Sequence, residues 1–357
     1  MSELTGPLIG PVEVIGAGLL GASVGLALRR AGLEVVLSDA SSDHLRTASG
    51  MGAGRPRTAA DRPQLVVVAV PPDHLGDVIA EALRSTDAVV TDVGSVKSGP
   101  LAAVADLPGV ERYVGSHPMA GSERSGPLAA TAALFDGRPW AVTPHERSEP
   151  AAVELVEALA RLCGGVPVRL SPREHDRAVA RTSHIPHLLA ALAAGRLAGA
   201  PVDHLALSGQ GVRDVTRVAA GDPVLYGQIV AANSEAVLDL LAEVRDRLDA
   251  VIDAVGASDR PGLQRLLEEG VAGTHAIPGK HGGPTRPTVS VFVSVPDHPG
   301  ELARLFADAG ASGVNIEDVH IDHDQGRPVG LVELVVEEGG AEHLLGSLES
   351  RGWTTHR

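Results

Sequence analysis

Apolar residues in the first 170 positions are grouped into short continuous runs. Four such runs, rich in valine, leucine and alanine, cover residues 12–15, 34–38, 65–70 and 88–92. Continuous apolar runs of this length are typical of strands in a parallel sheet that is covered on both faces. A helical pattern follows the first run and reaches about Ala31. The sequence therefore predicts an α/β domain that begins with a strand, a helix and a second strand.

This α/β domain is predicted to end at about residue 171. Its remaining elements are strands at 112–114, 140–143 and 166–170 and a helix at 151–162. From Pro172 to about Gly270 helical periodicity replaces the strand pattern. The helical region begins with a capping box, in which Ser171 is followed three residues later by Glu174.

The last part of the chain changes pattern again. Residues 271–287 contain glycines and three prolines, and they predict a flexible linker. Beyond it, strands are expected at 288–295, 314–321, 329–336 and 353–356, with helices at 301–309 and 341–350. The order βαββαβ is that of a ferredoxin-like unit. A unit of about 70 residues is near the lower limit for an independent core, so we expect it to pair with another copy or with the main body.

A glycine-rich turn joins the first strand to the first helix. Gly16, Gly18 and Gly21 form the pattern Gly-x-Gly-x-x-Gly, and the second strand ends in Asp39, about 18 residues further on. In a Rossmann-type domain, such a turn brings helix N–H groups to a pyrophosphate, and such an acid binds a ribose. An ordinary glycine turn is the alternative, but strand, turn, helix and acid all occur in order. Since no arginine is adjacent to Asp39 and a carboxylate would repel a 2′-phosphate, we expect NAD rather than NADP.

The predicted architecture therefore combines a Rossmann-type NAD-binding domain (1–171), an all-helical substrate domain (172–270), a linker (271–287) and a small C-terminal domain (288–357). Ligands of open α/β sheets bind beyond the carboxyl ends of the strands. The residues expected to bind the cofactor are Gly16, Gly18, Leu19, Gly21, Asp39, Val70 and Asp92.

Composition narrows the classes of partner. The chain has 44% hydrophobic and 21% charged residues, as in soluble globular proteins, and its formal net charge of −15 argues against nucleic acid or an anionic membrane as a partner. Cys163 is the only cysteine, so neither a disulfide framework nor a thiolate metal site is expected, and no metal is predicted. With no signal peptide and no apolar run near the ~20 residues that span a bilayer, we expect a cytoplasmic protein.

Residues 115–126 hold a dense group of polar side chains. His117 and Glu123 lie here with three serines, among glycines and a proline. Such a segment predicts a rigid loop rather than a helix or a central strand, and loops on a rigid scaffold often carry catalytic residues. Ser95 and Lys97 follow the fourth apolar run and are expected to point toward the reactive end of the cofactor. The alternative role of Ser95 is a helix N-cap.

The helical region supplies side chains that suit an anionic substrate. His184 and His187 begin a long helix, and Arg213 and Arg217 are four residues apart, on one face if the segment is helical. Each alone is more typical of a surface charge or a helix end. Together they predict the local positive cluster that an anion needs in a chain of negative net charge.

Five motifs together resemble the prephenate/arogenate dehydrogenases of tyrosine biosynthesis. They are residues 16–23, 91–97, 117–123, 183–187 and 213–217, in this order along the chain. The resemblance implies an NAD-dependent oxidative decarboxylation, in which a cyclohexadienyl alcohol loses a hydride and its ring carboxylate and becomes a phenol. It also implies that the helical domain forms a homodimer.

The resemblance implies roles for individual residues. His117 corresponds to the proton acceptor, with Ser95 at the same substrate oxygen. Arg217 corresponds to a carboxylate-binding residue, His184 to a substrate contact and Glu123 to part of a polar gate, while Arg213 supports the arginine-bearing loop. Tyr226 stands where relatives often carry a tryptophan, so we expect it at the substrate.

The C-terminal unit resembles an ACT domain, a module that usually binds a feedback effector in amino-acid metabolism. The residues that resemble its effector-binding turns are Asp297, His298, Gly300, Asn315 and Ile316. The hypothesis is that tyrosine or a related aromatic amino acid binds here. The alternative is a dimerisation module without a ligand.

Three functional alternatives remain at the level of sequence. The substrate is expected to be prephenate rather than arogenate, because the surroundings of His184, His187 and Arg213 look cationic and would disfavour an ammonium group. Another NAD-dependent hydroxyacid dehydrogenase would share the glycine turn. A non-catalytic sensor of NAD and an amino acid would share both the turn and the C-terminal unit.

Overall fold

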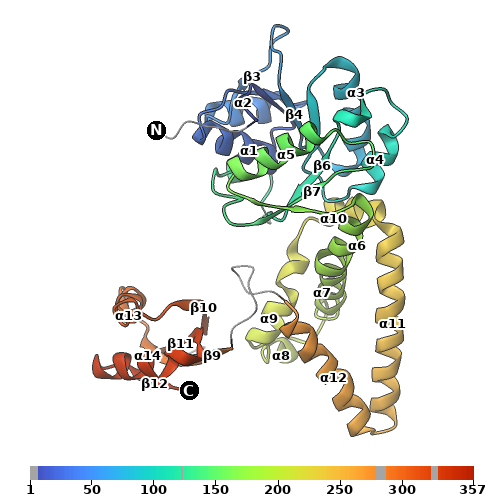
Figure 1. Ribbon diagram of the computed structural model, residues 1–357. Helices are drawn as coiled ribbons and strands as arrows, with labels where there is room; N and C mark the ends of the chain where they lie inside the picture. Colours follow the sequence, from blue (N-terminus) through green and yellow to red (C-terminus); the bar gives the residue numbers. More distant parts are fainter. Residues whose placement is uncertain (1–6, 122–123, 278–286, 323–328) are drawn as a thin grey trace. The chain divides into compact units, whose positions relative to one another are not determined.

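The computed structural model describes residues 7–121, 124–277, 287–322 and 329–357 (Figure 1). The chain divides into two compact units, Met1–Asp246 and Arg247–Arg357. The division falls inside helix α11 (Ser234–Gly256). Each unit is described by itself below.

The first unit contains the predicted α/β domain. Its main sheet has five parallel strands in the order β3-β2-β1-β4-β5. The strands are β1 (Val12–Ile15), β2 (Val35–Ser38), β3 (Arg55–Pro56), β4 (Leu65–Val68) and β5 (Val89–Asp92). The helices of this domain are α1 (Leu19–Arg30), α2 (Ser42–Gly50), α3 (Leu75–Ser85), α4 (Ser98–Val104) and α5 (Pro150–Leu162). The predicted strand-helix-strand beginning is confirmed.

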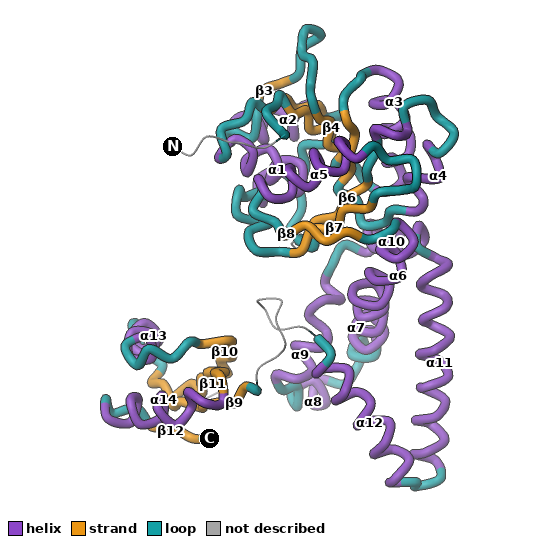
Figure 2. The backbone as a smooth tube through the Cα atoms, viewed as in Figure 1, coloured by secondary structure: helices purple, strands orange, loops and turns teal. Residues whose placement is uncertain are grey.

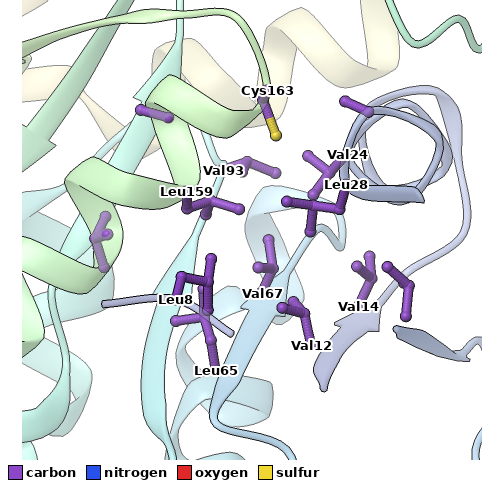
Figure 3. Packing of buried hydrophobic residues seen from close by; sticks show 14 of the residues in the cluster. Leu8, Val12, Val14, Val24, Leu28, Leu65, Val67, Val93, Leu159 and Cys163 are labelled. Atoms are coloured by element: carbon purple, nitrogen blue, oxygen red, sulfur yellow. The ribbon is translucent and has the colours of Figure 1, made fainter. Parts of the chain in front are cut away.

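Alternating residues of β4 belong to two different cores. Leu65 and Val67 pack with residues of α1 and α5, as Figure 3 shows around Val24, Leu28 and Leu159. Val66 and Val68 pack with residues of α3 and α4 in a second core. Helices therefore cover both faces of the sheet, which explains why the strands are continuously apolar. Cys163 is fully buried in the first core and is a free cysteine.

A second, three-stranded sheet changes one expectation. It has the order β6-β7-β8, with β6 (Gly115–Pro118) antiparallel to β7 (Pro139–Thr143) and β8 (Val166–Arg169) parallel to β7. The prediction that His117 lies in a loop was wrong, because the residue is paired with Ala141 inside β6. The predicted strand at 112–114 was also wrong in position, since only Tyr113 forms an isolated bridge, with Val90. An edge strand tolerates Pro118 at its last residue, because the missing N–H group costs no interior ladder bond.

The region after residue 171 is helical up to α11, as predicted, and Figure 2 draws it wholly as helix and loop. Its helices are α6 (Pro172–Val179), a π-helical turn (Ala180–His184), α7 (Ile185–Gly195), α8 (Val202–Leu205), α9 (Gln210–Arg217) and α10 (Pro223–Ala232). The Ser171 half of the predicted capping box is present, since the Ser171 Oγ accepts a hydrogen bond from the Glu174 N–H at 3.3 Å, and the Glu174 carboxylate lies 3.4 Å from the same hydroxyl group.

The second unit starts with the end of α11 and with α12 (Arg260–His275). The linker was predicted to start at residue 271, but α12 continues to His275, so that start was wrong. Residues 278–286 of the predicted linker lie outside the described part of the chain. No helix among the described residues is both long and apolar enough to cross a membrane.

The C-terminal part of this unit has the predicted βαββαβ order. Its sheet has the strand order β10-β11-β9-β12, with every neighbouring pair antiparallel. The elements are β9 (Thr288–Pro296), α13 (Glu301–Gly310), β10 (Ile316–Asp322), β11 (Val329–Glu337), α14 (Glu338–Ser350) and β12 (Thr354–His356). Residues of α13 and α14 share one core with residues of β9 and β11. This is the arrangement of a ferredoxin-like unit.

The glycine-rich turn is shaped by close approaches of the backbone. Gly16 has a φ of +99°, which disfavours any other residue. Gly21 lies in α1 and is fully packed, because an added Cβ would overlap the carbonyl oxygen of Gly16. Gly99, in the first turn of α4, has no atom within 4 Å of the same position. A Cβ atom would therefore clash at Gly21 but would fit without contact at Gly99.

We expect Gly21→Ala to lower the free energy of unfolding by about 1–3 kcal/mol or more, because the backbone must move to admit the methyl group. The matched control is Gly99→Ala, which adds the same methyl group in open space and should be neutral or stabilising by up to about 1 kcal/mol. Urea unfolding of both variants measures the difference. Equal stability of the two variants would contradict the packing argument.

Candidate active site

The glycine turn lies at the carboxyl end of β1 and leads into the N-terminus of α1. Gly18 is the N-cap residue of this helix and makes no side-chain capping bond, so N–H groups of the first turn lack a side-chain partner there. No atom lies within 4 Å of a Cβ placed on Gly18. Free N–H groups beside open space at a helix N-terminus suit a phosphate group.

Asp39 is held beside this turn. Its carboxylate accepts hydrogen bonds from the Ala17 N–H at 2.5 Å and from the Ser41 N–H at 2.6 Å. The acid at the end of β2 is thereby fixed next to the glycine turn at the end of β1. Leu19 and Val70 are partly exposed. These residues of the chain fit NAD, with the turn at the pyrophosphate and Asp39 at a ribose.

Asp92 has a different environment from the one predicted. Its side chain is fully buried and forms an ion pair with the Lys97 ammonium group. It also accepts hydrogen bonds from the Tyr113 hydroxyl at 2.8 Å and from the Gly94 N–H at 2.8 Å. The Asp92 carboxylate is therefore engaged within the protein, so a cofactor contact of this residue would not be made by its side chain; the predicted cofactor contact of Asp92 stays a prediction. Its partners give it a structural role.

Lys97 also departs from expectation. It was expected to point toward the cofactor, yet its side chain is fully buried between Asp92 and the carbonyl oxygen of Ser116, which accepts a hydrogen bond at 2.7 Å. Burial lowers the pKa of Lys97, while the charge of Asp92 opposes that shift. Because Ser116 precedes His117 in β6, Lys97 fixes the strand that carries the histidine.

His117 begins a chain of hydrogen bonds. Its Nδ1 lies 3.0 Å from the Nε2 of His175, and the Nδ1 of His175 lies 2.9 Å from the Oδ1 of Asp176. His117 is partly exposed, whereas His175 and Asp176 are buried. The chain thus leads from an accessible imidazole to a buried carboxylate.

Asp176 holds two structural regions together. From α6, its Oδ1 accepts a hydrogen bond from the Lys97 N–H at 2.8 Å and its Oδ2 accepts one from the Ser98 N–H at 2.8 Å. The carboxylate therefore caps α4 of the nucleotide-binding domain. Helix α4 starts at Ser98 with Lys97 at the N-cap position, so the alternative role of Ser95 as a helix cap was wrong.

The pKa values follow from this environment. Burial, together with the charges of His175, Lys97 and His184, holds the pKa of His117 well below 6.5. Burial also lowers the pKa of His175, against an opposing hydrogen bond to Asp176. Burial alone would raise the pKa of Asp176, but hydrogen bonds from His175, Ser98 and Lys97 outweigh it and lower that pKa. Near neutral pH both histidines are uncharged and the carboxylate is ionised.

His184 joins the same cluster through Asn233. The Asn233 side-chain amide donates to the backbone carbonyl of Asp176 at 2.8 Å and lies 3.2 Å from the Nδ1 of His184. Since that amide nitrogen is a donor, the Nδ1 of His184 accepts, and the proton of the neutral ring is on Nε2. Burial lowers the pKa of His184 to about 4.

His187 is stacked on Tyr226, with ring centroids 3.4 Å apart and an angle of 4° between the planes. Burial lowers the pKa of His187 as well. Its Nδ1 is buried without a hydrogen-bond partner among the described residues. The expected cationic environment rested on His184, His187 and Arg213. Desolvation lowers the pKa of both histidines and takes away their part of it, whereas the guanidinium group of Arg213 remains on α9. The charge argument for prephenate over arogenate loses this support.

The remaining predicted site residues are less closely tied to this cluster. Arg213 and Arg217 lie on α9, as expected, and both are exposed. Among the described residues, no hydrogen bond or ion pair joins Arg217 to the cluster around His117. Ser95 is partly exposed in the segment that follows β5. Glu123 lies outside the described residues.

Sequence reasoning missed His175 and Asp176. Both follow Glu174, which was recognised only as the end of a capping box. A histidine and an acid inside the first turns of a helix are usually surface residues, so spacing alone gave no signal.

Within the described residues, no group of three or more histidine, cysteine or acidic side chains is placed to hold a metal ion.

Comparisons with known proteins agree with this geometry. Residues 24–169 match the nucleotide-binding domain of prephenate dehydrogenase, and residues 171–269 match the dimerisation domain of the same enzyme. Together these matches cover more than half of the chain. This chain belongs to the prephenate dehydrogenase family.

Relatives in this family cover nearly the whole chain. A probable prephenate dehydrogenase of Streptomyces niveus, NovF, is 36% identical over 353 residues, which is 95% of this chain and 98% of the relative. The prephenate dehydrogenase of Bacillus subtilis is 29% identical over 326 residues, 87% of each chain.

Solved structures of related enzymes share the fold. Prephenate dehydrogenase of Aquifex aeolicus, solved with hydroxyphenyl propionate and NAD+, has a TM-score of 0.67 and 26% identity; the match covers 74% of this chain and 96% of that one. Arogenate dehydrogenase of Synechocystis has a TM-score of 0.62 and 26% identity, over 74% of this chain and 98% of that one. The prephenate dehydrogenase family therefore accounts for both the NAD-binding fold and the helical region after it.

The buried ion pair in this family member yields a stability prediction. Lys97→Met leaves Asp92 buried without its counter-charge and should lower the free energy of unfolding by about 3–5 kcal/mol. The control Arg46→Met removes an ion pair with Asp43 whose side chains are both 77% exposed, and should cost about 0–1 kcal/mol. Urea unfolding compares the two variants. A loss at Lys97 no larger than the loss at Arg46 would contradict the assigned role.

Proposed function

We propose that this chain catalyses the NAD-dependent oxidative decarboxylation of prephenate to 4-hydroxyphenylpyruvate in tyrosine biosynthesis. The observation that carries the proposal is a neutral, partly exposed His117 in the same domain as a turn that fits NAD. The family supports the reaction class, since relatives at 36% and 29% identity are named prephenate dehydrogenases. NAD serves as the hydride acceptor.

The chemistry requires one proton acceptor. The hydroxyl group of the substrate gives its proton to His117, and the electron pair of that O–H bond forms a carbonyl as hydride leaves the carbinol carbon. The bond to the ring carboxylate then breaks, carbon dioxide departs, and its electron pair passes through the ring to the carbonyl oxygen. The resulting phenolate takes a proton and becomes the phenol. The overall reaction releases no net proton, so His117 can return to the phenolate the proton that it accepted from the hydroxyl group.

His117 suits this role because its pKa is depressed. Burial is the main cause of the lowered pKa and keeps the imidazole neutral near pH 7, and only the neutral ring can accept a proton. Ser95, in the segment after β5, is proposed to hydrogen-bond to the same substrate oxygen. A fixed base of this kind contributes about 10²–10⁴-fold to a rate.

The rest of the substrate is assigned to the helical region. Arg217 is proposed to hold a carboxylate, since a guanidinium group can bind both oxygens at once. His184 is proposed as a substrate contact that donates from Nε2, because Asn233 occupies its other ring nitrogen. Tyr226 is proposed to form a wall of the site through its stack on His187. Arg213 and Glu123 are proposed as a support and a gate.

The second candidate function is that of an arogenate dehydrogenase, because the two possible substrates differ only in their side chain. Prephenate carries a keto group where arogenate carries an ammonium group. The neutral rings of His184 and His187 give no electrostatic bar to the ammonium group. Prephenate is preferred because the relatives from Streptomyces niveus and Bacillus subtilis are named as a probable prephenate dehydrogenase and a prephenate dehydrogenase. The arogenate dehydrogenase of Synechocystis supports the alternative.

We also propose that the helical domain forms a homodimer. The family description of residues 171–269 as a dimerisation domain supports this assembly. Several apolar side chains of the helical region in the first unit are more than half exposed in the single chain, among them Leu192 on α7, Val224 on α10 and Leu238 on α11. Such surface is expected to be covered by a second copy.

The C-terminal unit is proposed to be an ACT-like module that binds tyrosine. Its two candidate turns lie at opposite ends of the sheet. At the start of β10, Ile316 is paired with Val336 of β11, and Val336 is paired with Val289 of β9. Val289 is seven residues before Pro296, the last residue of β9. The turn with Asp297 and His298 follows directly. This separation is about 23 Å at the usual rise of a strand. A tyrosine-sized ligand that touches both turns therefore needs two copies of the unit.

We expect His117→Ala to lower turnover by about 10²–10⁴-fold, because the variant lacks the base, while NAD binding stays unchanged. Stopped-flow or steady-state NADH formation measures turnover, and calorimetry with NAD measures binding. Near-normal turnover with prephenate and arogenate would contradict the assignment of the base.

The same base predicts the pH dependence of the wild type. Since the neutral form is active and burial depresses the pKa of His117, kcat/KM should fall only as the pH drops well below 6.5. An acid limb centred above pH 6.5 would be inconsistent with this environment.

A single assay separates the candidate functions. NADH formation is measured with prephenate and with arogenate, each with and without tyrosine. We expect turnover of prephenate, and inhibition by tyrosine that Asn315→Ala weakens. Turnover of arogenate alone would establish the second function, and no NADH with either substrate would favour a non-catalytic sensor. Absence of any tyrosine effect would leave the C-terminal unit as a dimerisation module.

A further inference from the structure

The hydrogen bonds from Asp176 outward determine where the protons lie. The ionised carboxylate can only accept, so the Nδ1 of His175 must donate to it at 2.9 Å. A neutral imidazole has one N–H group, so the Nε2 of His175 is then an acceptor. It lies 3.0 Å from the Nδ1 of His117, which must therefore carry a proton. The lone pair of the His117 ring is consequently on Nε2.

Asp176 is well suited to enforce this direction. Three donors converge on its two oxygens: the Nδ1 of His175 and the N–H groups of Lys97 and Ser98. Protonation of the carboxylate would weaken all three bonds, because a neutral carboxyl group is a poorer acceptor than a carboxylate. His175 is 1% exposed and Asp176 is 5% exposed, so water does not compete strongly for either side chain.

We propose that His175 and Asp176 are positioning residues for His117: they keep its proton on Nδ1, present the Nε2 lone pair to the substrate hydroxyl, and stabilise the imidazolium ion until its proton returns to the product. This proposal rests on the proposed function of His117 as the base. It goes beyond that function by assigning two residues of α6 to the control of a residue in β6.

The direction of the hydrogen bonds matters for the rate. A neutral His117 with its proton on Nε2 would offer the substrate a donor and could not take the hydroxyl proton. When Nε2 does accept the proton, the positive charge is bonded through His175 to the carboxylate of Asp176. The charged or titratable groups that face His117 are His175, Lys97 and His184, and those that face His175 also include Asp92. Lys97 and Asp92 neutralise each other, which leaves Asp176 as the unpaired negative charge of the cluster.

His184 provides an internal reference of opposite type. Its Nδ1 accepts from Asn233, so its proton is on Nε2. The two histidines of one site are thus predicted to be opposite tautomers, the first an acceptor at Nε2 and the second a donor there. A measurement that distinguishes the two ring nitrogens tests the proposal without substrate.

The first experiment is ¹⁵N NMR of the histidine rings in the full-length protein at pH 7.5, with signals assigned through His117→Gln and His184→Gln. We expect the Nδ1–H tautomer for His117 and the Nε2–H tautomer for His184. In His175→Phe, His117 should lose its preference for Nδ1–H while His184 keeps its own signal. A His117 ring with its proton on Nε2 in the wild type would overturn the proposal.

The second experiment compares kinetics of two substitutions at His175. His175→Gln keeps a neutral acceptor within reach of His117 and should lower kcat by about 10-fold, whereas His175→Phe removes the acceptor and should lower it by about 10²–10³-fold, within the range of general-base catalysis. KM for the substrate and the Kd of NAD should change by less than about 3-fold. The control His145→Gln removes another hydrogen-bonded histidine of the same domain and should leave kcat unchanged.

The outcomes separate this proposal from the proposed function. Loss of activity in His175→Phe with an unchanged His117 tautomer would mean that His175 is merely structural, and the proposal would fail. Equal kcat values for both substitutions and the wild type would also overturn it. If His117→Ala were active while the NMR tautomers were as expected, the proposed function of His117 would fail but the assigned hydrogen-bond direction would stand. If His175→Phe did not fold, His175→Gln and the wild-type spectrum would still decide the question.

Discussion

The buried carboxylate of Asp176 is the constraint on which the arrangement of the site depends. It receives two N–H groups at the start of α4 and the imidazole of His175, and its own backbone carbonyl receives Asn233. One residue thus fixes the junction between the nucleotide-binding domain and the helical region. Burying such a charge is costly unless every lone pair is used. That cost favours a single geometry of the junction, and His117 and His184 take their positions from it.

Electrostatics in the cluster keep the imidazoles neutral. Lys97 is paired with Asp92, so its charge adds only modestly to the field at His117, and burial is the main cause of the depressed pKa values. Neutral rings can differ in tautomer, which two imidazolium rings cannot. The chain therefore builds one acceptor and one donor from the same residue type by giving Nδ1 of each ring a different partner. Burial thus governs charge, and hydrogen bonding governs direction.

Local patterns predicted the fold well and the site only in part. The glycine turn, the continuous apolar strands and the βαββαβ order depend on neighbouring residues, so the sequence contains them directly. The strand β6 was missed because glycine and proline around His117 are typical of loops, and pairing with β7 overrides that preference. His175 and Asp176 were missed because their contacts with His117 and Lys97 join positions 58 and 79 residues apart. Desolvation of His184 and His187 could not be inferred from the sequence either, and it removed the positive charge expected of these two rings.

Topology sets a similar limit on regulation. In the C-terminal sheet β9 and β10 both run antiparallel to β11 and are therefore parallel to each other. The end of β9 and the start of β10 consequently lie at opposite ends of the sheet. The turn at Asp297 and the segment at Asn315 cannot share a small ligand within one copy. Two copies related by a two-fold axis that passes between these two regions can bring the turn of one beside the segment of the other. A ligand held there would bind only the paired state and would stabilise it, so effector binding by these turns would be coupled to dimerisation of the C-terminal units.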